Sequence, residues 1–211
     1  MARKLRVEYS GSIYHVMDRG DRRERIFMDD ADRQRFVETL GEVCAKTGWQ
    51  IHAYVLMPNH FHWVVETPQP NLVAGMKWLL GTDTSRFNRR HKLLGHLFSG
   101  RYKSLIVDGS GSGYLKSVCD YVHLNPARAN LVAADAPLKS FAWSSWPAYL
   151  IARLKRPAWL RVGRASPRTV LRGGNGLSRR WRNGAGWRKA RSSSRFGAVG
   201  VWARRNSGRS C

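Results

Sequence analysis

The chain has 211 residues, of which 43% are hydrophobic, and it carries a formal net charge of +23. This length and apolar content allow one folded domain with its own core and an appendage, or at most two small domains. No run of about 18 uncharged apolar residues occurs, which excludes a membrane-spanning helix, and the basic N-terminus has no apolar segment behind it, so no secretory signal is expected.

The first half of the predicted domain alternates strands and helices. Residues 9–18 alternate in polarity and predict a strand. Asp29 or Asp30 can cap a helix that ends near Gly48. Two further strands are predicted, expected to be antiparallel and separated by a Pro-Asn turn; they cover residues 49–57 and 61–66.

The second half adds a helix, a strand and a last helix. Asn71 can cap a helix with apolar residues at helical spacing. A strand is predicted over residues 101–108 and a helix over residues 111–124. The order β-α-β-β-α-β with an additional helix predicts an α+β, ferredoxin-like fold, in which two helices cover one face of a four- to five-stranded antiparallel sheet.

The last third of the chain differs in character. Residues 151–211 hold 17 of the 37 Lys and Arg residues and no Asp or Glu. Their composition, rich in Arg, Gly, Ser and Trp, predicts a disordered basic tail after a domain formed by residues 1–150. The tail is either an arm that adds salt-sensitive DNA affinity or an out-of-frame extension of a GC-rich gene, which the sequence of the locus would decide.

The charge and the cysteines bound the partner and the compartment. A balance this basic predicts a polyanionic partner, and nucleic acid is the default. The three cysteines, Cys44, Cys119 and Cys211, are far apart and form no CxxC pair. This pattern argues against a disulfide framework or a thiolate zinc site, and we expect a reducing cytoplasm, with the protein associated with the nucleoid.

The first candidate site is His60-Phe61-His62, at the start of a predicted strand. Because side chains alternate along a strand, both imidazoles lie on one face, where they can bind the same divalent cation, while Phe61 and Trp63 enter the core. A His-x-His pair is also common as two ordinary histidines, so this pattern leaves both interpretations open.

The second candidate site is the end of the last predicted helix. Tyr121 and Asn125 are four residues apart and share a face. An Asn carbonyl could complete a metal site, and a tyrosine beside a metal-polarised phosphate could attack it. Alternatively, Tyr121 packs the helix and Asn125, expected as its last residue before Pro126, caps it. Tyr114, on nearly the same face, is the rival nucleophile.

Two groups of basic residues are candidate DNA contacts. In the larger group, aromatic residues (Phe87, Phe98 and Tyr102) are interleaved with the cations, a composition typical of single-stranded DNA binding but also of a solvated face above core aromatics. The larger group is Arg86, Arg89, Arg90, Lys92, Arg101 and Lys103. The smaller group follows the first strand and comprises Arg19, Arg22 and Arg23.

Several stretches between residues 5 and 132 resemble the REP-associated tyrosine transposases, which are single-tyrosine HUH (His-hydrophobic-His) transposases. These stretches are RVEYSGSIYHVMDRGDRRERIF, HAYVLMPNHFHWVVETP, SRFNRRH, LGHLFSGRYKSLIVD and YVHLNPARANLV. The chain departs from the family at Asp83, where an aromatic residue is expected nearby, and in its tail, where the family's usual C-terminal portion is not recognisable.

The resemblance implies a ferredoxin-like HUH fold with a catalytic C-terminal helix. It implies Mg²⁺ or Mn²⁺ held by His60, His62 and Asn125, and Tyr121 as the nucleophile. Attack on a DNA phosphate then leaves a 5′-phosphotyrosine and a free 3′-OH, with no nucleotide cofactor. The implied substrate is single-stranded or hairpin DNA from palindromic repeats, acted on by a monomer or homodimer.

Two alternatives to a transposase-type nickase and ligase share this fold. A domesticated, non-catalytic DNA-binding protein is expected to lose His60, His62 or Tyr121, and all three are present. An HUH replication initiator or relaxase is expected to bring a helicase or oligomerisation module, for which the chain shows no pattern.

Overall fold

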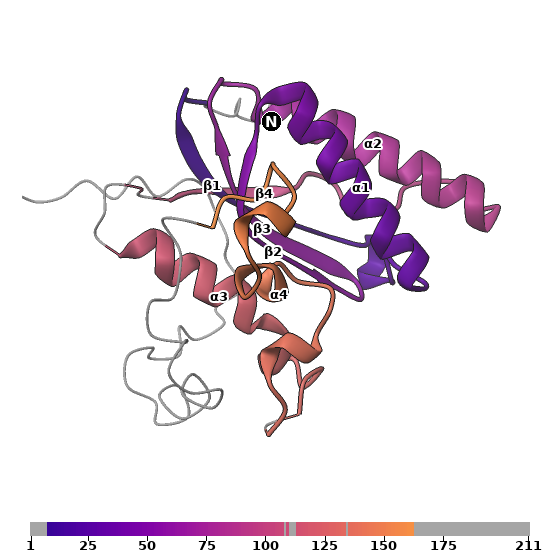
Figure 1. Cartoon of the computed structure of the whole chain (residues 1–211). Coiled ribbons are helices and arrows are strands. Elements are labelled where there is room, and N and C mark those ends of the chain that lie inside the picture. Colours follow the sequence, from indigo (N-terminus) through magenta and orange to yellow (C-terminus); the bar gives the residue numbers. More distant parts are fainter. Residues whose placement is uncertain (1–7, 108, 110–112, 134, 163–211) are drawn as a thin grey trace, which may run out of the picture.

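A computed structural model describes residues 8–107, 109, 113–133 and 135–162. Its centre is one antiparallel sheet of four strands in the order β2-β3-β1-β4 (Figure 1). The strands are β1 (Ser12–Arg19), β2 (Gln50–Met57), β3 (His60–Thr67) and β4 (Lys103–Val107). This order and the intervening helices confirm the ferredoxin-like prediction, with four strands.

Two long helices cover one face of the sheet (Figure 1). They are α1 (Asp30–Thr47) and α2 (Leu72–His91). Asp29 caps α1, because its Oδ1 accepts a hydrogen bond from the Asp32 N–H at 3.0 Å, and Gly48 ends the helix in the left-handed region at φ 75°. Both boundaries confirm the sequence prediction.

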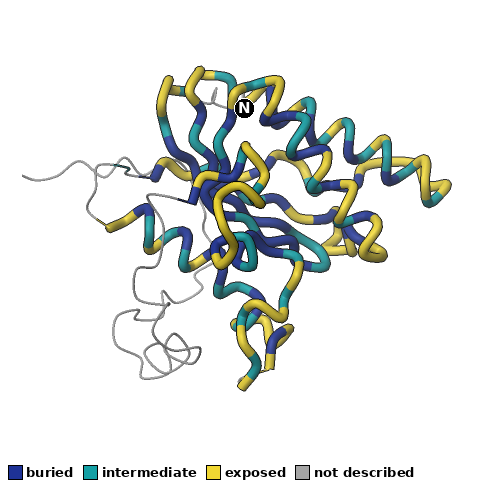
Figure 2. The backbone as a smooth tube through the Cα atoms, in the orientation of Figure 1, coloured by how far each residue is buried: buried dark blue, intermediate teal, exposed yellow. Residues whose placement is uncertain are grey.

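The core lies between these helices and the sheet, where the tube of Figure 2 is dark blue along the strands. Phe36 of α1 meets Phe61 and Trp63 of β3 at ring-centroid distances of 5.3 and 5.8 Å. All three side chains are fully buried. The alternation that sends Phe61 and Trp63 into the core directs His60 and His62 to the opposite face.

Asn71 begins α2 without capping it through its side chain. Its Oδ1 instead accepts a hydrogen bond from Trp49 Nε1 at 2.7 Å, and its Nδ2 donates to the Thr47 carbonyl at 3.0 Å. The side chain thus satisfies the buried indole N–H and ties the start of α2 to the end of α1, a use that depends on tertiary contacts rather than on the local sequence.

The helix α3 (Tyr114–Arg128) packs on the other face, against β2 and β3 (Figure 1). The expectation that it ends at Asn125 is wrong: it continues through Pro126 to Arg128. Proline leaves the Val122 carbonyl without its usual N–H donor. Asn125 Nδ2 donates to that carbonyl at 3.3 Å and to the Tyr121 carbonyl at 2.9 Å, which compensates the break.

Short helices complete the described chain: η1 (Asp21–Arg23), η2 (Leu138–Ser140), α4 (Trp146–Tyr149) and η3 (Arg153–Lys155). The segment around the last three of these helices runs along β2, where Leu56 N–H donates to the Trp143 carbonyl at 2.8 Å and Ile51 N–H donates to the Trp159 carbonyl at 2.9 Å. The residues predicted as tail therefore include a stretch paired with the sheet. Residues 163–211 lie outside the described residues.

In the described part of the chain, no helix combines the length and apolar character that crossing a membrane requires.

Candidate active site

Three histidines gather on the sheet face that α3 covers. The β1–β3 register sets Met17 opposite His62, so His15, two residues away, lies on the same face and diagonal to His62. The two rings stack with centroids 5.3 Å apart, and His15 Nε2 lies 3.1 Å from His62 Nδ1. The ring of His60 meets that of His62 edge-on at 5.2 Å.

The hydrogen bonds of these rings determine which nitrogen atoms remain available. His60 Nδ1 donates to Asn59 Oδ1 at 2.8 Å, and His62 Nδ1 is paired with His15. Each candidate ligand therefore keeps its Nε2 for a cation. A second partner on the other ring nitrogen is the usual way in which proteins orient a metal-binding imidazole.

All three imidazoles are neutral at pH 7. Burial lowers the pKa of His15 to about 4. Burial, with smaller effects of His15 and His60, lowers the pKa of His62 to about 3. Burial and then the charge of Arg19 lower the pKa of His60. Since the neutral imidazole is the form that binds a divalent cation, the donor set fits such an ion.

Tyr121 reaches the histidines from α3. Its ring centroid lies 5.8 Å from that of His15 and 6.1 Å from that of His62, edge-on in both cases. The side chain is 38% exposed. The structure thus brings together His60, His62 and Tyr121 as the sequence predicts, and leaves the tyrosine accessible from outside.

Asn125 lies one turn beyond Tyr121 on α3. Its Nδ2 is committed to helix carbonyls, so Oδ1 is the atom that could serve as a ligand. Within the described residues, no hydrogen bond joins it to either histidine, and no group of three or more His, Cys, Asp or Glu side chains is placed to hold a metal ion. A site built on the two histidines would need an amide oxygen or water as further ligands.

Sequence reasoning missed His15. Period-two alternation along β1 places His15 on one face with Met17, but only the register with β3 brings it next to His62. The signal available in the sequence was a third histidine inside a predicted strand, and that pattern alone does not identify its neighbour.

Five of the nine candidate DNA-binding residues lie at the histidine end of the sheet. Arg19 lies opposite His60 in the β1–β3 register. Arg22 and Arg23 follow Arg19 in the chain, and Arg101 and Lys103 belong to the segment that hydrogen-bonds to β1. Arg22 and Arg23 have φ values of 50° and 65°, an uncommon conformation for non-glycine residues that recurs at functional sites. The five are Arg19, Arg22, Arg23, Arg101 and Lys103.

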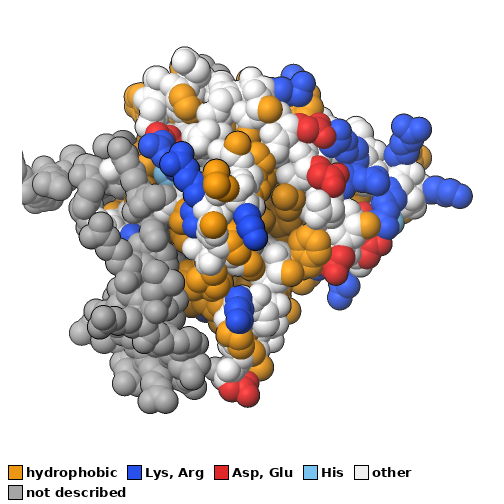
Figure 3. Space-filling view, in the orientation of Figure 1, with side chains coloured by type: hydrophobic (Ala, Val, Ile, Leu, Met, Phe, Trp, Pro, Cys, Tyr) orange, Lys and Arg blue, Asp and Glu red, His pale blue; other side chains and the backbone are white. Residues whose placement is uncertain are grey.

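The other four candidates, Arg86, Arg89, Arg90 and Lys92, belong to α2 and its C-cap. Arg86 forms a bidentate ion pair with Glu42 at 3.0 Å, and Arg90 pairs with Asp29 and Asp32. Figure 3 shows acidic and basic side chains intermixed over this part of the surface.

The interleaved aromatic residues are part of the core. Phe87, Phe98 and Tyr102 are all at most 8% exposed. Their side chains are therefore not available as a platform on which unstacked bases could stack, which favours the alternative of core aromatics beneath a solvated face.

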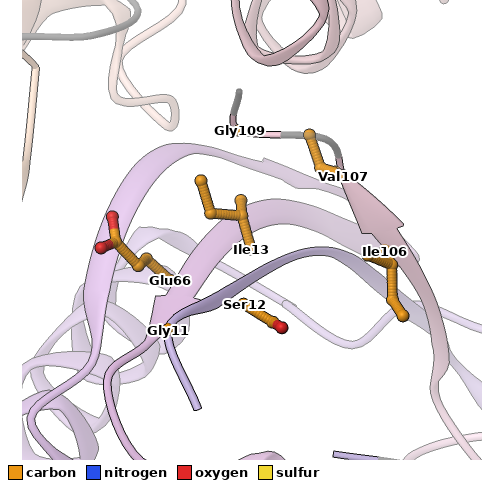
Figure 4. A pocket seen from close by; sticks show the side chains of 7 residues that line it. All are labelled: Gly11, Ser12, Ile13, Glu66, Ile106, Val107 and Gly109. Carbon is orange, nitrogen blue, oxygen red and sulfur yellow. The ribbon is translucent and has the colours of Figure 1, made fainter. Parts of the chain in front are cut away.

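A hollow at the opposite end of the sheet is not the histidine site (Figure 4). Ile13, Ile106 and Val107 line it together with Glu66. Glu66 lies six residues along β3 from His60, about 20 Å at ~3.3 Å per residue. Its carboxylate is bound by His52 and Arg161, each at 3.0 Å, so this end of the sheet carries a structural ion pair.

Comparison with known proteins supports this architecture. Residues 8–125 match the family described as Transposase IS200 like. The structure is similar to that of a REP-associated tyrosine transposase bound to a REP hairpin, with a TM-score of 0.58 and 16% identity over 74% of this chain and 89% of that chain. This likeness shows a shared fold.

A putative transposase from Deinococcus radiodurans R1 is 19% identical over 56% of this chain and 97% of that chain, with a TM-score of 0.40. No curated protein matches the chain. Because the family match spans more than half of the sequence and includes both histidines, Tyr121 and Asn125, the chain belongs to the IS200-like transposases, a family of DNA transposases.

Proposed function

We propose that this transposase cuts and rejoins single-stranded or hairpin DNA through a covalent bond between Tyr121 and a 5′-phosphate. The observation that carries the proposal is the approach of the exposed Tyr121 ring to His15 and His62, at 5.8 and 6.1 Å. An exposed tyrosine next to the two histidines can reach a phosphate that approaches them from solvent.

The reaction is a transesterification. The Tyr121 oxygen attacks phosphorus, the bond from phosphorus to the 3′-oxygen breaks, and the phenolic proton is lost while the departing 3′-oxygen gains one. The product is a 5′-phosphotyrosine and a free 3′-OH. Attack of a 3′-OH on this linkage rejoins the strand and releases Tyr121, so the phosphodiester bond energy is conserved without a nucleotide cofactor.

His60 and His62 would hold Mg²⁺ or Mn²⁺ through their Nε2 atoms, and Asn125 through Oδ1. Such an ion, when bound, makes phosphorus more electrophilic and stabilises the leaving oxygen. The chain itself orients the two rings, through Asn59 for His60 and His15 for His62, and keeps both imidazoles in the neutral form that a cation requires.

We assign the DNA backbone to the basic residues at the histidine end of the sheet. Arg22 and Arg23 are exposed, and the carbonyl of Arg23 is held by Asn59, the residue before His60. Arg101 is also exposed. It lies two residues after Ser99, whose N–H donates a hydrogen bond to the Arg19 carbonyl. Cations at the histidine end of the sheet would fix the register of a phosphate chain.

The test is covalent capture. Wild type, Tyr121→Phe and Tyr114→Phe proteins are incubated with labelled single-stranded hairpin DNA, taken from repeats flanking the gene, and Mn²⁺. We expect a protein–DNA adduct for wild type and Tyr114→Phe and none for Tyr121→Phe. An adduct that persists in Tyr121→Phe would refute the nucleophile, and wild type that binds this DNA without any adduct would support a non-catalytic DNA-binding protein instead.

A further inference from the structure

The ring of Tyr121 has a partner that neither the predicted site nor the proposed reaction uses. The guanidinium carbon of Arg128 lies 4.8 Å from the centroid of the Tyr121 ring. This distance is typical of a cation–π contact. The guanidinium is planar, so it can also stack on the ring, which the ammonium group of a lysine cannot do.

The contact depends on the continuation of α3 through Pro126. Residues seven apart on a helix share a face two turns apart, so Arg128 reaches Tyr121 only if the helix persists to its position. The hydrogen bonds of Asn125 to the Tyr121 and Val122 carbonyls maintain it there. A helix that ended at Asn125 would leave Arg128 on a loop without a fixed direction.

The surroundings of Arg128 differ from those of the α2 arginines. Arg86 and Arg90 form ion pairs with carboxylates of α1 and its cap, whereas Arg128 is exposed and forms no ion pair with Asp or Glu among the described residues. The cation therefore stays next to the ring and is not drawn away by a carboxylate.

Tyr121 needs such a contact more than a core tyrosine does. It is 38% exposed, and the ring contacts that it makes with His15 and His62 are edge contacts at 5.8 and 6.1 Å. Rotation of an exposed side chain moves its hydroxyl by several ångströms, and a misplacement of about 1 Å can slow a reaction on the order of 100-fold. A planar group stacked on the ring restricts this rotation.

We propose that Arg128 is a positioning residue for Tyr121: its guanidinium stacks on the ring and holds the hydroxyl in the orientation for attack on the phosphate. This inference rests on the proposed role of Tyr121 as the nucleophile. The guanidinium acts through the ring, so removing it slows the covalent step rather than weakening the binding of DNA.

The kinetic test compares Arg128→Met, which keeps the length of the side chain but removes its charge and plane, with Arg128→Lys and the control Arg35→Met. Arg35 is an exposed arginine in α1, which covers the other face of the sheet. Adduct formation is followed in single turnover over a range of hairpin DNA concentrations with Mn²⁺. We expect Arg128→Met to lower the saturated rate by about 10- to 100-fold with the half-saturating DNA concentration unchanged. Arg128→Lys should recover part of the rate, and Arg35→Met should match wild type.

A saturated rate equal to that of wild type, with a raised half-saturating concentration, would overturn the proposal, because it would show a simple phosphate contact. A second readout needs no cleavage: the ring resonances of Tyr121 in DNA-free protein should shift and broaden in Arg128→Met, with Tyr114 as the internal reference. Unchanged Tyr121 resonances also overturn the proposal. If wild type forms no adduct, the proposed function fails, and the resonances still decide whether Arg128 orders the ring.

Discussion

His15 Nε2 lies 3.1 Å from His62 Nδ1, and this contact between neighbouring strands orients the ring of His62, whose centroid lies 6.1 Å from that of Tyr121. The contact occupies one nitrogen of His62 and directs the other away from His15. A histidine that is no candidate ligand thus determines how a candidate ligand presents itself.

The first prediction concerns this pair. His15→Ala should weaken Mn²⁺ binding by about 10- to 100-fold, because the loss of a partner that orients a metal ligand commonly has this effect. Titration of free Mn²⁺ by electron paramagnetic resonance measures the affinity. His96→Ala removes an exposed histidine and should leave the affinity unchanged; equal affinities of His15→Ala and wild type would exclude the orienting role.

The second prediction concerns the proline in α3. Asn125→Ala should lower the free energy of unfolding by about 1 kcal/mol, since two carbonyls lose a donor. Pro126→Ala restores a backbone N–H to the Val122 carbonyl, so Asn125→Ala should cost less in the Pro126→Ala background. Urea unfolding of the four proteins of this double-mutant cycle gives the coupling, expected at about 0.5–1 kcal/mol. Additive effects would mean that the Asn125 amide does not compensate for the proline.

The third prediction separates the basic residues into structural and DNA-contacting groups. Arg86→Met should lower the free energy of unfolding by about 0.5–1 kcal/mol, the effect of a partly exposed ion pair, and leave DNA affinity unchanged. Arg101→Met should do the opposite: it should weaken DNA binding and reduce the slope of log affinity against log salt by about one. Fluorescence anisotropy with labelled hairpin DNA measures the DNA affinity and its salt dependence for both variants. A reduced slope in Arg86→Met would assign that residue to the DNA interface.

The fourth prediction concerns Asp83, a buried carboxyl group in α2. Burial raises the pKa of Asp83 to about 7, the Asp32 carboxylate adds to the rise, and Arg86 and Arg35 oppose it. Because the folded pKa lies above the ordinary value of 3.8, the fold is favoured by the protonated form. This stability is complete below about pH 4 and is lost as the pH rises to about 7.

Asp83→Asn imitates the protonated carboxyl and should therefore be more stable than wild type at pH 8, by up to about 4 kcal/mol at ~1.4 kcal/mol per pKa unit. The difference should vanish near pH 4. Chemical unfolding across this range tests it, with the exposed Asp135→Asn as a control that stays level with wild type. A pH-independent difference between Asp83→Asn and wild type would contradict the titration.

The parts of the molecule that local patterns control were predictable. Alternation in β3 places His60 and His62 on one face and Phe61 on the other, and the cap residues Asp29 and Gly48 bound α1. These features depend on residues within a few positions of one another, and the element order follows from them.

The parts that depend on contacts between distant elements were not predictable in the same way. His15 meets His62 only through strand register. The contact of Arg128 with Tyr121 lies within one helix, but it requires α3 to continue past a proline, which the usual effect of proline argues against. The ion pair of Arg86 with Glu42 joins two helices through residues that are 44 positions apart in sequence. Local preferences predicted Arg86 as a DNA contact or a solvated cation, and a tertiary ion pair overrides this prediction. They also predicted a helix end at Asn125, which side-chain hydrogen bonds within α3 override.

The side-chain amide of Asn59 forms hydrogen bonds with two neighbouring residues. Its Oδ1 accepts the hydrogen bond of the His60 ring, and its Nδ2 donates to the Arg23 carbonyl. The loop that carries Arg22 and Arg23 therefore cannot move away from the β2–β3 turn without breaking a bond made by the group that orients His60. The main-chain position of two candidate DNA contacts and the orientation of a candidate metal ligand are therefore coupled through a single side chain.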